Sequence, residues 1–168
     1  MWGVGVAPAK WERPQPDKSM KNRTKTIIFD LDGTLVDLSS YPEIELLADA
    51  ELLRRLKPVY NFAIVTGGTT EETIFALEKT GIINLFDKGL IVTADIVSES
   101  KKTGASFLEI IKRINGRAIV IGDSDSDRIG AEKARLPLIL LRRQADINTQ
   151  RNEFTKVLKR AAQILDED

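Results

Sequence analysis

The chain has 168 residues, a length that suits one domain and leaves little room for two. Its 25 Lys and Arg residues balance its 25 Asp and Glu residues, so no overall charge favours binding to nucleic acid or to a membrane surface. The absence of Cys and His excludes disulfides, thiol nucleophiles, thiolate metal sites and an imidazole base. Catalysis would therefore use carboxylates, lysines, hydroxyls and a hard metal ion such as Mg²⁺.

The first 22 residues differ in character from the rest of the chain. Prolines interrupt this segment, and it shows neither helical nor strand periodicity. Residues 1–22 are therefore predicted to be a flexible extension and residues 23–168 the folded domain, with an ordered N-terminal arm as the alternative. The opening residues lack the basic and apolar regions of a secretion signal, and no apolar run approaches the roughly 20 residues that cross a bilayer. We expect a cytoplasmic protein with no membrane partner.

After this extension, short apolar runs alternate with segments of helical periodicity. Strands are predicted over residues 26–30, 62–66, 90–92, 118–121 and 138–141. Helices are predicted over residues 43–57, 70–80 and 106–114, in a segment that ends at residue 134, and in a closing segment that runs to about residue 165. The alternation indicates right-handed βαβ units. It predicts an α/β fold, a Rossmann-like three-layer sandwich with a parallel five-stranded sheet.

Polar side chains gather after the predicted strands, where ligands bind in parallel sheets. In chain order they are Asp30 and Asp32, Thr66 and Gly67, Lys101 and Lys102, and Asp123 and Asp127. Alternation along an extended segment directs the side chains of Asp30 and Asp32 to the same side, and Gly33 permits a sharp turn after them. Four chain segments thus present acids, a hydroxyl, a cation and further acids.

This order of residues resembles the four motifs of the haloacid dehalogenase (HAD) superfamily. The first motif is the Asp-Leu-Asp-Gly-Thr sequence at residues 30–34, the second is Thr66 at the end of a strand, the third is a lysine, and the fourth is the Gly-Asp-x-x-x-Asp sequence at residues 122–127. The resemblance extends from about residue 26 to about residue 141. It implies a HAD-like fold and transfer of a phosphoryl group through an aspartyl-phosphate.

The resemblance also implies the catalytic roles of the first motif. Asp30, ionised at neutral pH, would attack phosphorus in line and become phosphorylated. Asp32 would protonate the leaving oxygen and then remove a proton from water. An acid at this second position resembles the phosphatase and phosphomutase branches, whereas dehalogenases lack it.

A metal site follows from the same resemblance. Mg²⁺ would be held by the Asp30 carboxylate, the main-chain carbonyl of Asp32 and the Asp123 carboxylate. Asp127 would contribute directly or through a metal-bound water.

Phosphoryl oxygens would be bound by the Thr66 hydroxyl, the Gly67 N–H group and a lysine. Aligning the Phe-Leu pair at residues 107–108 with the Lys-Pro-x-Pro-x-x-Phe-Leu pattern of many relatives favours Lys101 as that lysine, with Lys102 as the alternative. Both prolines of the pattern are missing from this chain.

Loops rich in Asp can also bind calcium, and single acids or hydroxyls can have purely structural roles. Neither the loop that begins at Asp30 nor the one that begins at Asp123 has the Gly at position six and the Glu at position twelve of a calcium-binding EF-hand. Asp125 or Asp127 could instead cap a helix. Thr66 could be an ordinary turn residue.

The spacing of the motifs indicates that the protein has no cap domain. About 36 residues separate Asp30 from Thr66 and about 35 separate Thr66 from Lys101, and one βα unit uses most of each interval. An open site in this superfamily goes with large phosphorylated substrates, or with small ones covered by a neighbouring subunit of a homo-oligomer.

The leading functional hypothesis is a magnesium-dependent phosphatase that hydrolyses a phosphate monoester. The alternatives are a non-catalytic subunit that binds phosphorylated ligands and a phosphotransferase with an acceptor other than water. The segments that would determine specificity, residues 36–42 and 68–71, contain no recognisable code for the substrate.

Overall fold

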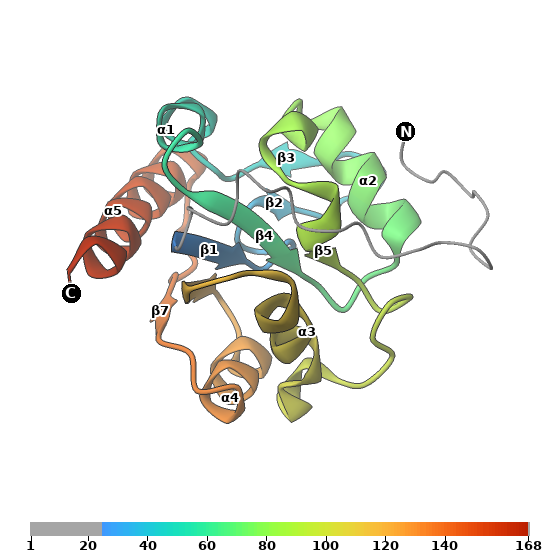
Figure 1. The fold of residues 1–168 in the computed structure, drawn as a ribbon. Helices are drawn as coiled ribbons and strands as arrows, with labels where there is room; N and C mark the ends of the chain where they lie inside the picture. The colour runs from blue at the N-terminus through green and yellow to red at the C-terminus, as the bar shows by residue number, and fades with distance from the viewer. Residues whose placement is uncertain (1–24, 168) are drawn as a thin grey trace.

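A computed structural model describes residues 25–167, which fold around one parallel sheet of five strands (Figure 1). The strands are β1 (Lys25–Phe29), β4 (Asn61–Val65), β5 (Ile91–Val92), β6 (Arg117–Gly122) and β7 (Leu138–Leu140). The helices are α1 (Ala50–Leu56), α2 (Thr70–Lys79), α3 (Ala105–Arg113), α4 (Asp125–Lys133) and α5 (Ile147–Asp166). The predicted α/β sandwich is confirmed. The predicted flexible extension, residues 1–22, lies outside the described residues.

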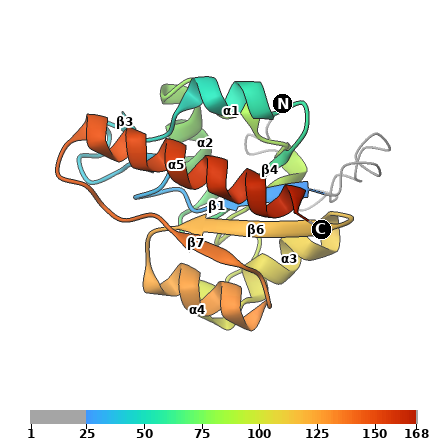
Figure 2. The same ribbon diagram turned by 90° about the vertical axis from the view of Figure 1, so that its left-hand side faces the viewer.

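The helices cover both faces of the sheet, as Figure 2 shows, with α1, α2 and α5 on one side and α3 and α4 on the other. The side chains of β1 alternate between two apolar cores. Ile27 and Phe29 pack in the core under α1, α2 and α5, where the Phe29 ring contacts Phe62 and Phe154. Ile28 packs in the core under α3 and α4. Burial on both faces explains why β1 reads as a continuous apolar run.

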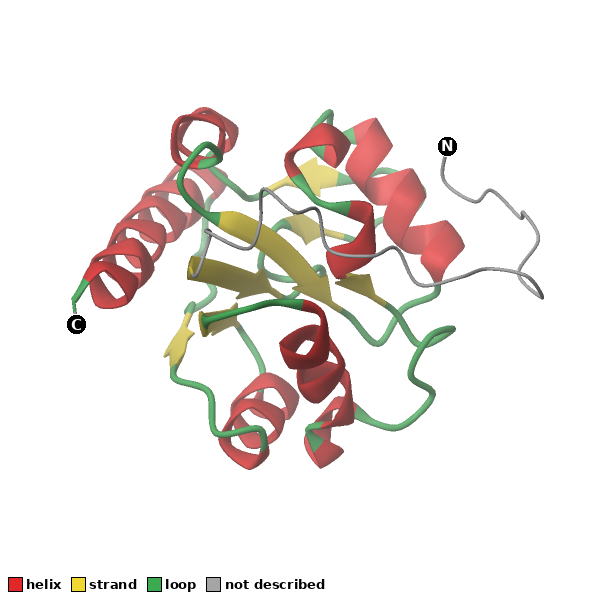
Figure 3. Cartoon of the chain, in the orientation of Figure 1, coloured by secondary structure: helices red, strands yellow, loops and turns green. Residues whose placement is uncertain are grey.

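The strand order β5-β4-β1-β6-β7 places the first strand in the centre of the sheet. From β1 the chain builds β4 and β5 on one side, then crosses to form β6 and β7 on the other. The loops that follow β1 and β6 therefore leave the sheet in opposite directions. Such a switch point opens a crevice at the carboxyl ends of the strands, which is where ligands bind in sheets of this kind. Figure 3 shows these loops in green.

The predicted helix over residues 43–57 is wrong in its first half. Residues Glu45–Leu46 form β3, which pairs antiparallel with β2 (Val36–Asp37) as a small hairpin. Helix α1 begins at residue 50 because the Asp49 side chain accepts a hydrogen bond from the Leu52 N–H group, which fixes an N-cap at that position.

The two intervals between the motifs hold little structure of their own. Residues 31–65 contain the β2–β3 hairpin, α1 and β4, and residues 67–100 contain α2, the short 3₁₀ helices η3 (Ile83–Leu85) and η4 (Lys88–Leu90), and β5. Neither interval, each described in full, contains a separate domain, as the spacing predicts. Among the helices of residues 25–167, none combines the length and the apolar character needed to cross a membrane.

Candidate active site

Three carboxylates meet at the switch point of the sheet. Asp30 follows β1, Asp123 follows β6, and Asp127 lies in the first turn of α4. Each offers a carboxylate oxygen, and these oxygens all lie within 4.8 Å of one another. Gly33 makes this approach possible, because its φ is +87° and a Cβ atom there would lie 2.1 Å from Asp123 Oδ2.

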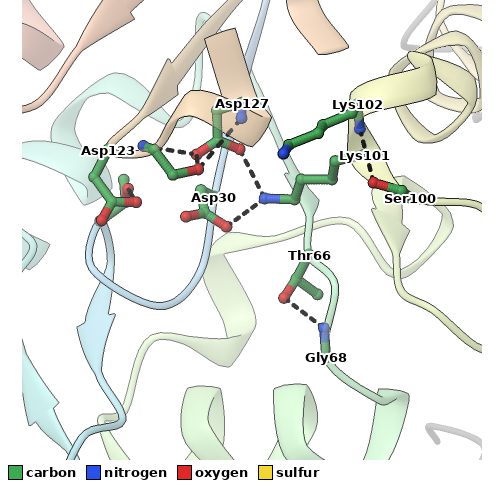
Figure 4. Close-up of polar contacts among 10 residues, drawn as sticks. Asp30, Thr66, Gly68, Ser100, Lys101, Lys102, Asp123 and Asp127 are labelled. Atoms are coloured by element: carbon green, nitrogen blue, oxygen red, sulfur yellow. Dashed lines mark hydrogen bonds and ion pairs between the residues drawn. The ribbon is translucent and has the colours of Figure 1, made fainter. Parts of the chain in front are cut away.

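Lys101 bridges two of these carboxylates, as Figure 4 shows. Its Nζ atom donates to Asp30 Oδ1 at 2.6 Å and to Asp127 Oδ1 at 2.7 Å. The lysine begins the 3₁₀ helix η5 (Lys101–Thr103), and its side chain is only 10 % exposed. The side chain of Lys102 forms no ion pair with any residue of the described chain, although its N–H group donates to Ser100 Oγ. The geometry thus places Lys101, and not Lys102, in contact with the acids.

The charges in this cluster shift one another's titration. Burial raises the pKa of Asp30 well above its usual value, and the neighbouring Asp127 adds to the rise, while Lys101 opposes it. Burial alone would lower the pKa of Lys101, but Asp30 and Asp127 outweigh that effect and raise it. The cluster contains more acids than cations, so it favours a further cation.

Asp127 has a structural role as well as a place in the cluster. Its Oδ2 atom accepts hydrogen bonds from the Ser124 hydroxyl and N–H group, and the Ser124 hydroxyl accepts from the Asp127 N–H group. This reciprocal capping box begins α4 and fixes the side chain, leaving Oδ1 for Lys101. Asp127 therefore both caps α4 and belongs to the carboxylate cluster. Asp125, by contrast, is exposed and pairs with Arg128.

Asp32 lies in the turn after β1 but outside the carboxylate cluster. Its side chain is exposed, and Oδ1 accepts a hydrogen bond from the Leu38 N–H group at 2.9 Å. This contact fixes the turn that leads to the β2–β3 hairpin. The roles of Asp32 in metal binding and proton transfer stay predictions.

Thr66 and Gly67 lie at the end of β4. The Thr66 hydroxyl accepts a hydrogen bond from the Gly68 N–H group at 3.1 Å, which stabilises the turn and leaves its own proton free to donate. Together with Lys101, both residues border a cavity of about 360 Å³. The structure therefore places Thr66, Gly67 and Lys101 around one open space that Lys102 does not line, and the role of these residues in binding phosphate stays a prediction.

The sequence interpretation missed several residues of the site. Thr34 donates from its hydroxyl to Asp123 Oδ1 at 3.4 Å, and serines line the cavity beside Lys101. The Ser-x-x-Asp pattern at residues 124–127 is a capping signal that could have identified the start of α4. The cavity serines come from separate segments, and no sequence pattern connects them.

The donor set fits a hard divalent cation. Asp30, Asp123 and Asp127 supply oxygen ligands, which Mg²⁺ and Ca²⁺ prefer over softer donors. The excess of acid over Lys101 supplies the electrostatic reason for a cation to bind. Metal binding by this cluster is therefore chemically consistent with the residues present.

A family model described as haloacid dehalogenase-like hydrolase matches residues 43–141, more than half of the chain. The chain belongs to the haloacid dehalogenase-like hydrolase family. The matched region of this HAD-like hydrolase includes Thr66, Lys101, Asp123 and Asp127, and it begins after the first motif. No curated protein matches the sequence significantly.

Solved structures show the same fold at low sequence identity. A HAD-superfamily hydrolase of subfamily IA, variant 1, from Geobacter sulfurreducens is 20 % identical, with a TM-score of 0.59 over 69 % of this chain and 88 % of that chain. A HAD-hydrolase from Bacillus subtilis, bound to magnesium, is 16 % identical, with a TM-score of 0.59 over 71 % and 89 % of the two chains. A HAD-superfamily hydrolase from Ehrlichia chaffeensis is 18 % identical, with a TM-score of 0.56 over 79 % and 97 %.

Proposed function

We propose that this HAD-like hydrolase is a magnesium-dependent phosphatase that hydrolyses a phosphate monoester through an aspartyl-phosphate at Asp30. The position of Asp30 carries the proposal. Its carboxylate belongs to a cluster of acids within 4.8 Å and lies 2.6 Å from the Lys101 ammonium, at the switch point of the sheet. A carboxylate nucleophile, a fixed cation and a metal-binding acid cluster are the parts that phosphoryl transfer needs.

Mg²⁺ would be held by Asp30, Asp123 and Asp127, and the magnesium-bound Bacillus subtilis structure of the same fold supports this choice of ion. When bound, it would neutralise charge on the acids and on the phosphoryl group. The donor set and the surplus of acid support the assignment.

The residues of the chain would divide the remaining work. Lys101, the Thr66 hydroxyl and the Gly67 N–H group would hold the phosphoryl oxygens. An Asp30 oxygen would bond to phosphorus as the ester P–O bond breaks, and Asp32 would give its proton to the leaving oxygen. Asp32 would then take a proton from water, whose oxygen attacks phosphorus and breaks the bond to Asp30. Inorganic phosphate and the free carboxylate result, and the exposure of Asp32 fits exchange of protons with the leaving group and water.

Release of p-nitrophenol from p-nitrophenyl phosphate tests the proposal. We expect turnover with Mg²⁺, loss of turnover with EDTA, and a loss of at least a thousandfold in Asp30→Asn, because an amide is not a nucleophile here. Asp125→Asn is the matched control, since Asp125 is an exposed acid of the α4 segment outside the cluster.

Unchanged turnover in Asp30→Asn would overturn the assignment. No turnover on a broad panel of phosphate esters, together with Mg²⁺-dependent binding of a phosphorylated ligand, would instead favour a non-catalytic binding subunit. Phosphorylated products formed when alcohols or sugars are added would indicate a phosphotransferase.

A further inference from the structure

The cavity beside Lys101 extends beyond the groups that would bind phosphate. It has a volume of about 360 Å³ and lies between the turn after β4, residues 94–100 and the start of α4. Thr66, Gly67 and Lys101 form part of its wall, so the cavity is continuous with the proposed phosphate site. A phosphate ester bound there would extend its alcohol portion into this space.

The wall of the cavity is rich in hydroxyl groups. The serines are Ser98, Ser100, Ser106, Ser124 and Ser126. Two of them are occupied, since Ser100 accepts from the Lys102 N–H group and Ser124 caps α4. The side chains of the other three have no hydrogen-bond partner within residues 25–167.

Ser106 offers a hydroxyl to the cavity from the first turn of α3. The residue is only 3 % exposed, yet its hydroxyl has no hydrogen-bond partner among the described residues. The hydroxyl faces the open cavity, where solvent or a ligand can satisfy it. Ser106 comes from α3 and lines the cavity together with Thr66, so its hydroxyl can serve a ligand that fills the space.

The charges of the wall disfavour a second anionic group on the ligand. Lys101 is already engaged by Asp30 and Asp127, and Glu99 is the other charged residue that lines the cavity. A carboxylate or second phosphate would meet Glu99 without a free cation to pair with. Hydroxyl groups on a ligand, in contrast, can both donate to and accept from the serines.

We propose that the cavity binds the alcohol portion of the substrate, and that the substrate is the phosphate monoester of a small, neutral polyhydroxylated alcohol or sugar. This inference rests on the proposed phosphatase function. The volume falls at the lower end of the roughly 300–1,000 Å³ of small-molecule sites, which favours a small substrate over a macromolecular phosphate. Ala94 and Val97 supply a short apolar surface for the carbon chain.

Two matched probes test the charge argument. Sorbitol 6-phosphate and 6-phosphogluconate have the same length and differ at the far carbon, which carries a hydroxymethyl group in one and a carboxylate in the other. We expect kcat/KM for sorbitol 6-phosphate to be at least tenfold higher. Isothermal titration of the Asp30→Asn variant with each probe measures binding without turnover, and we expect the same preference in Kd.

Ser106→Ala tests the hydroxyl argument with a small change of volume. We expect the ratio of kcat/KM for sorbitol 6-phosphate to kcat/KM for p-nitrophenyl phosphate to fall about fivefold, the effect of one hydrogen bond. Ser126→Ala should lower the same ratio. Because Ser126 is only half-buried, this variant keeps the test valid if Ser106→Ala fails to fold. Thr80→Ala removes a hydroxyl at the far end of α2 and should leave the ratio unchanged.

The outcomes separate the two proposals. One outcome keeps the phosphatase proposal and overturns the neutral-polyol inference. In it, hydrolysis of p-nitrophenyl phosphate depends on Asp30, but 6-phosphogluconate is hydrolysed or bound no less well than sorbitol 6-phosphate. An unchanged ratio in both serine variants would likewise overturn the role of the cavity. No turnover of any of these esters would overturn the proposed function and this inference with it.

Discussion

At the residue scale, the contacts of Lys101 determine what its removal does. Its ammonium lies 2.6 Å from Asp30 and 2.7 Å from Asp127, both buried. Lys101→Met leaves these carboxylates facing each other without a cation. Breaking a buried pair in this way costs about 3 kcal/mol, and we expect the melting temperature to fall by about 10 °C as turnover is lost.

Lys102→Met is the control for this prediction, because Lys102 is the exposed neighbour. Surface substitutions usually change stability by less than about 0.5 kcal/mol. Thermal unfolding and hydrolysis of p-nitrophenyl phosphate measure both variants. If Lys102→Met were the inactive variant and Lys101→Met the active one, the assignment of the lysine would be reversed.

The raised pKa of Asp30 leads to a second prediction, for the metal-free protein. Below pH 3.8, the ordinary pKa of an Asp carboxyl, Asp30 is protonated in both the folded and the unfolded chain, so its ionisation does not lower the free energy of unfolding. As the pH rises from 3.8 through the raised pKa of the folded state, ionisation favours the unfolded chain. We therefore expect Asp30→Asn to raise the melting temperature at pH 7 in EDTA, and the gain to disappear below pH 3.8.

A comparison of melting curves across this pH range, with Asp125→Asn beside it, checks the prediction. A destabilised Asp30→Asn protein at pH 7 would show that the ion pair with Lys101 outweighs the burial of the carboxylate. With Mg²⁺ added, we expect the wild type to melt at the higher temperature, since the ion would bind the wild-type acid cluster better than a cluster that contains an amide.

The order of the acids, the hydroxyl and the lysines along the chain predicted that Asp30, Lys101, Asp123 and Asp127 lie together, but it also included Asp32 and Lys102, which lie outside the acid cluster. Sequence favoured Lys101 but left Lys102 as the alternative, since adjacent residues differ in burial only once η5 packs against α4. It could not identify Ser106 either, because an unpaired hydroxyl is defined by the residues packed around it.

At the element scale, the contact between α4 and η5 holds Lys101 in place. A Cβ atom on Gly130 of α4 would lie 2.1 Å from the Lys101 carbonyl oxygen and 2.8 Å from Phe107 Cε2. We expect Gly130→Ala to displace η5, to destabilise the protein by about 2 kcal/mol despite the better helix propensity of Ala, and to lower kcat.

Glu132→Ala provides the comparison, since it alters an exposed position of the same helix. Denaturant unfolding and kinetic measurements on both variants test the prediction. Wild-type stability and kcat in Gly130→Ala would show that α4 can move away from η5 without disturbing Lys101.

The incorrect start of α1 shows where periodicity is insufficient. Ile44 and Leu47 fit a helical repeat with the residues that follow, but the chain here pairs with β2 instead. That pairing brings Val36 beside Leu46, ten positions later, across the loop of residues 38–44. The cap at Asp49 was a local signal that could have corrected the boundary.

At the scale of the whole molecule, the acid cluster links metal binding to global stability. A ligand that binds the folded chain alone stabilises it by about 2.7 kcal/mol when its concentration is 100 times Kd. We expect the melting temperature to rise with Mg²⁺ concentration and EDTA to reverse the rise. Asp123→Asn should abolish most of the response, whereas Asp125→Asn should keep it. An equal response in both variants would place the ion elsewhere.

The architecture was predictable because alternating apolar runs and amphipathic segments allow few arrangements other than a covered parallel sheet. Asp30 and Asp123 lie 93 positions apart in the sequence, and predicting their proximity required the order of the strands as well as their existence. The short β2–β3 hairpin escaped prediction because two-residue strands have too few positions to show a period.

The central place of β1 also affects how the protein emerges from the ribosome. β1 is the first strand of the sheet to be synthesised, but one of its edges stays open until residues 117–122 have been made and can form β6. Until then its apolar residues lack half of their partners, and the nascent chain exposes a strand that invites pairing with other chains. Contacts so distant in sequence also slow folding. The arrangement that assembles Asp30, Asp123 and Lys101 therefore delays completion of the site until most of the domain has been translated.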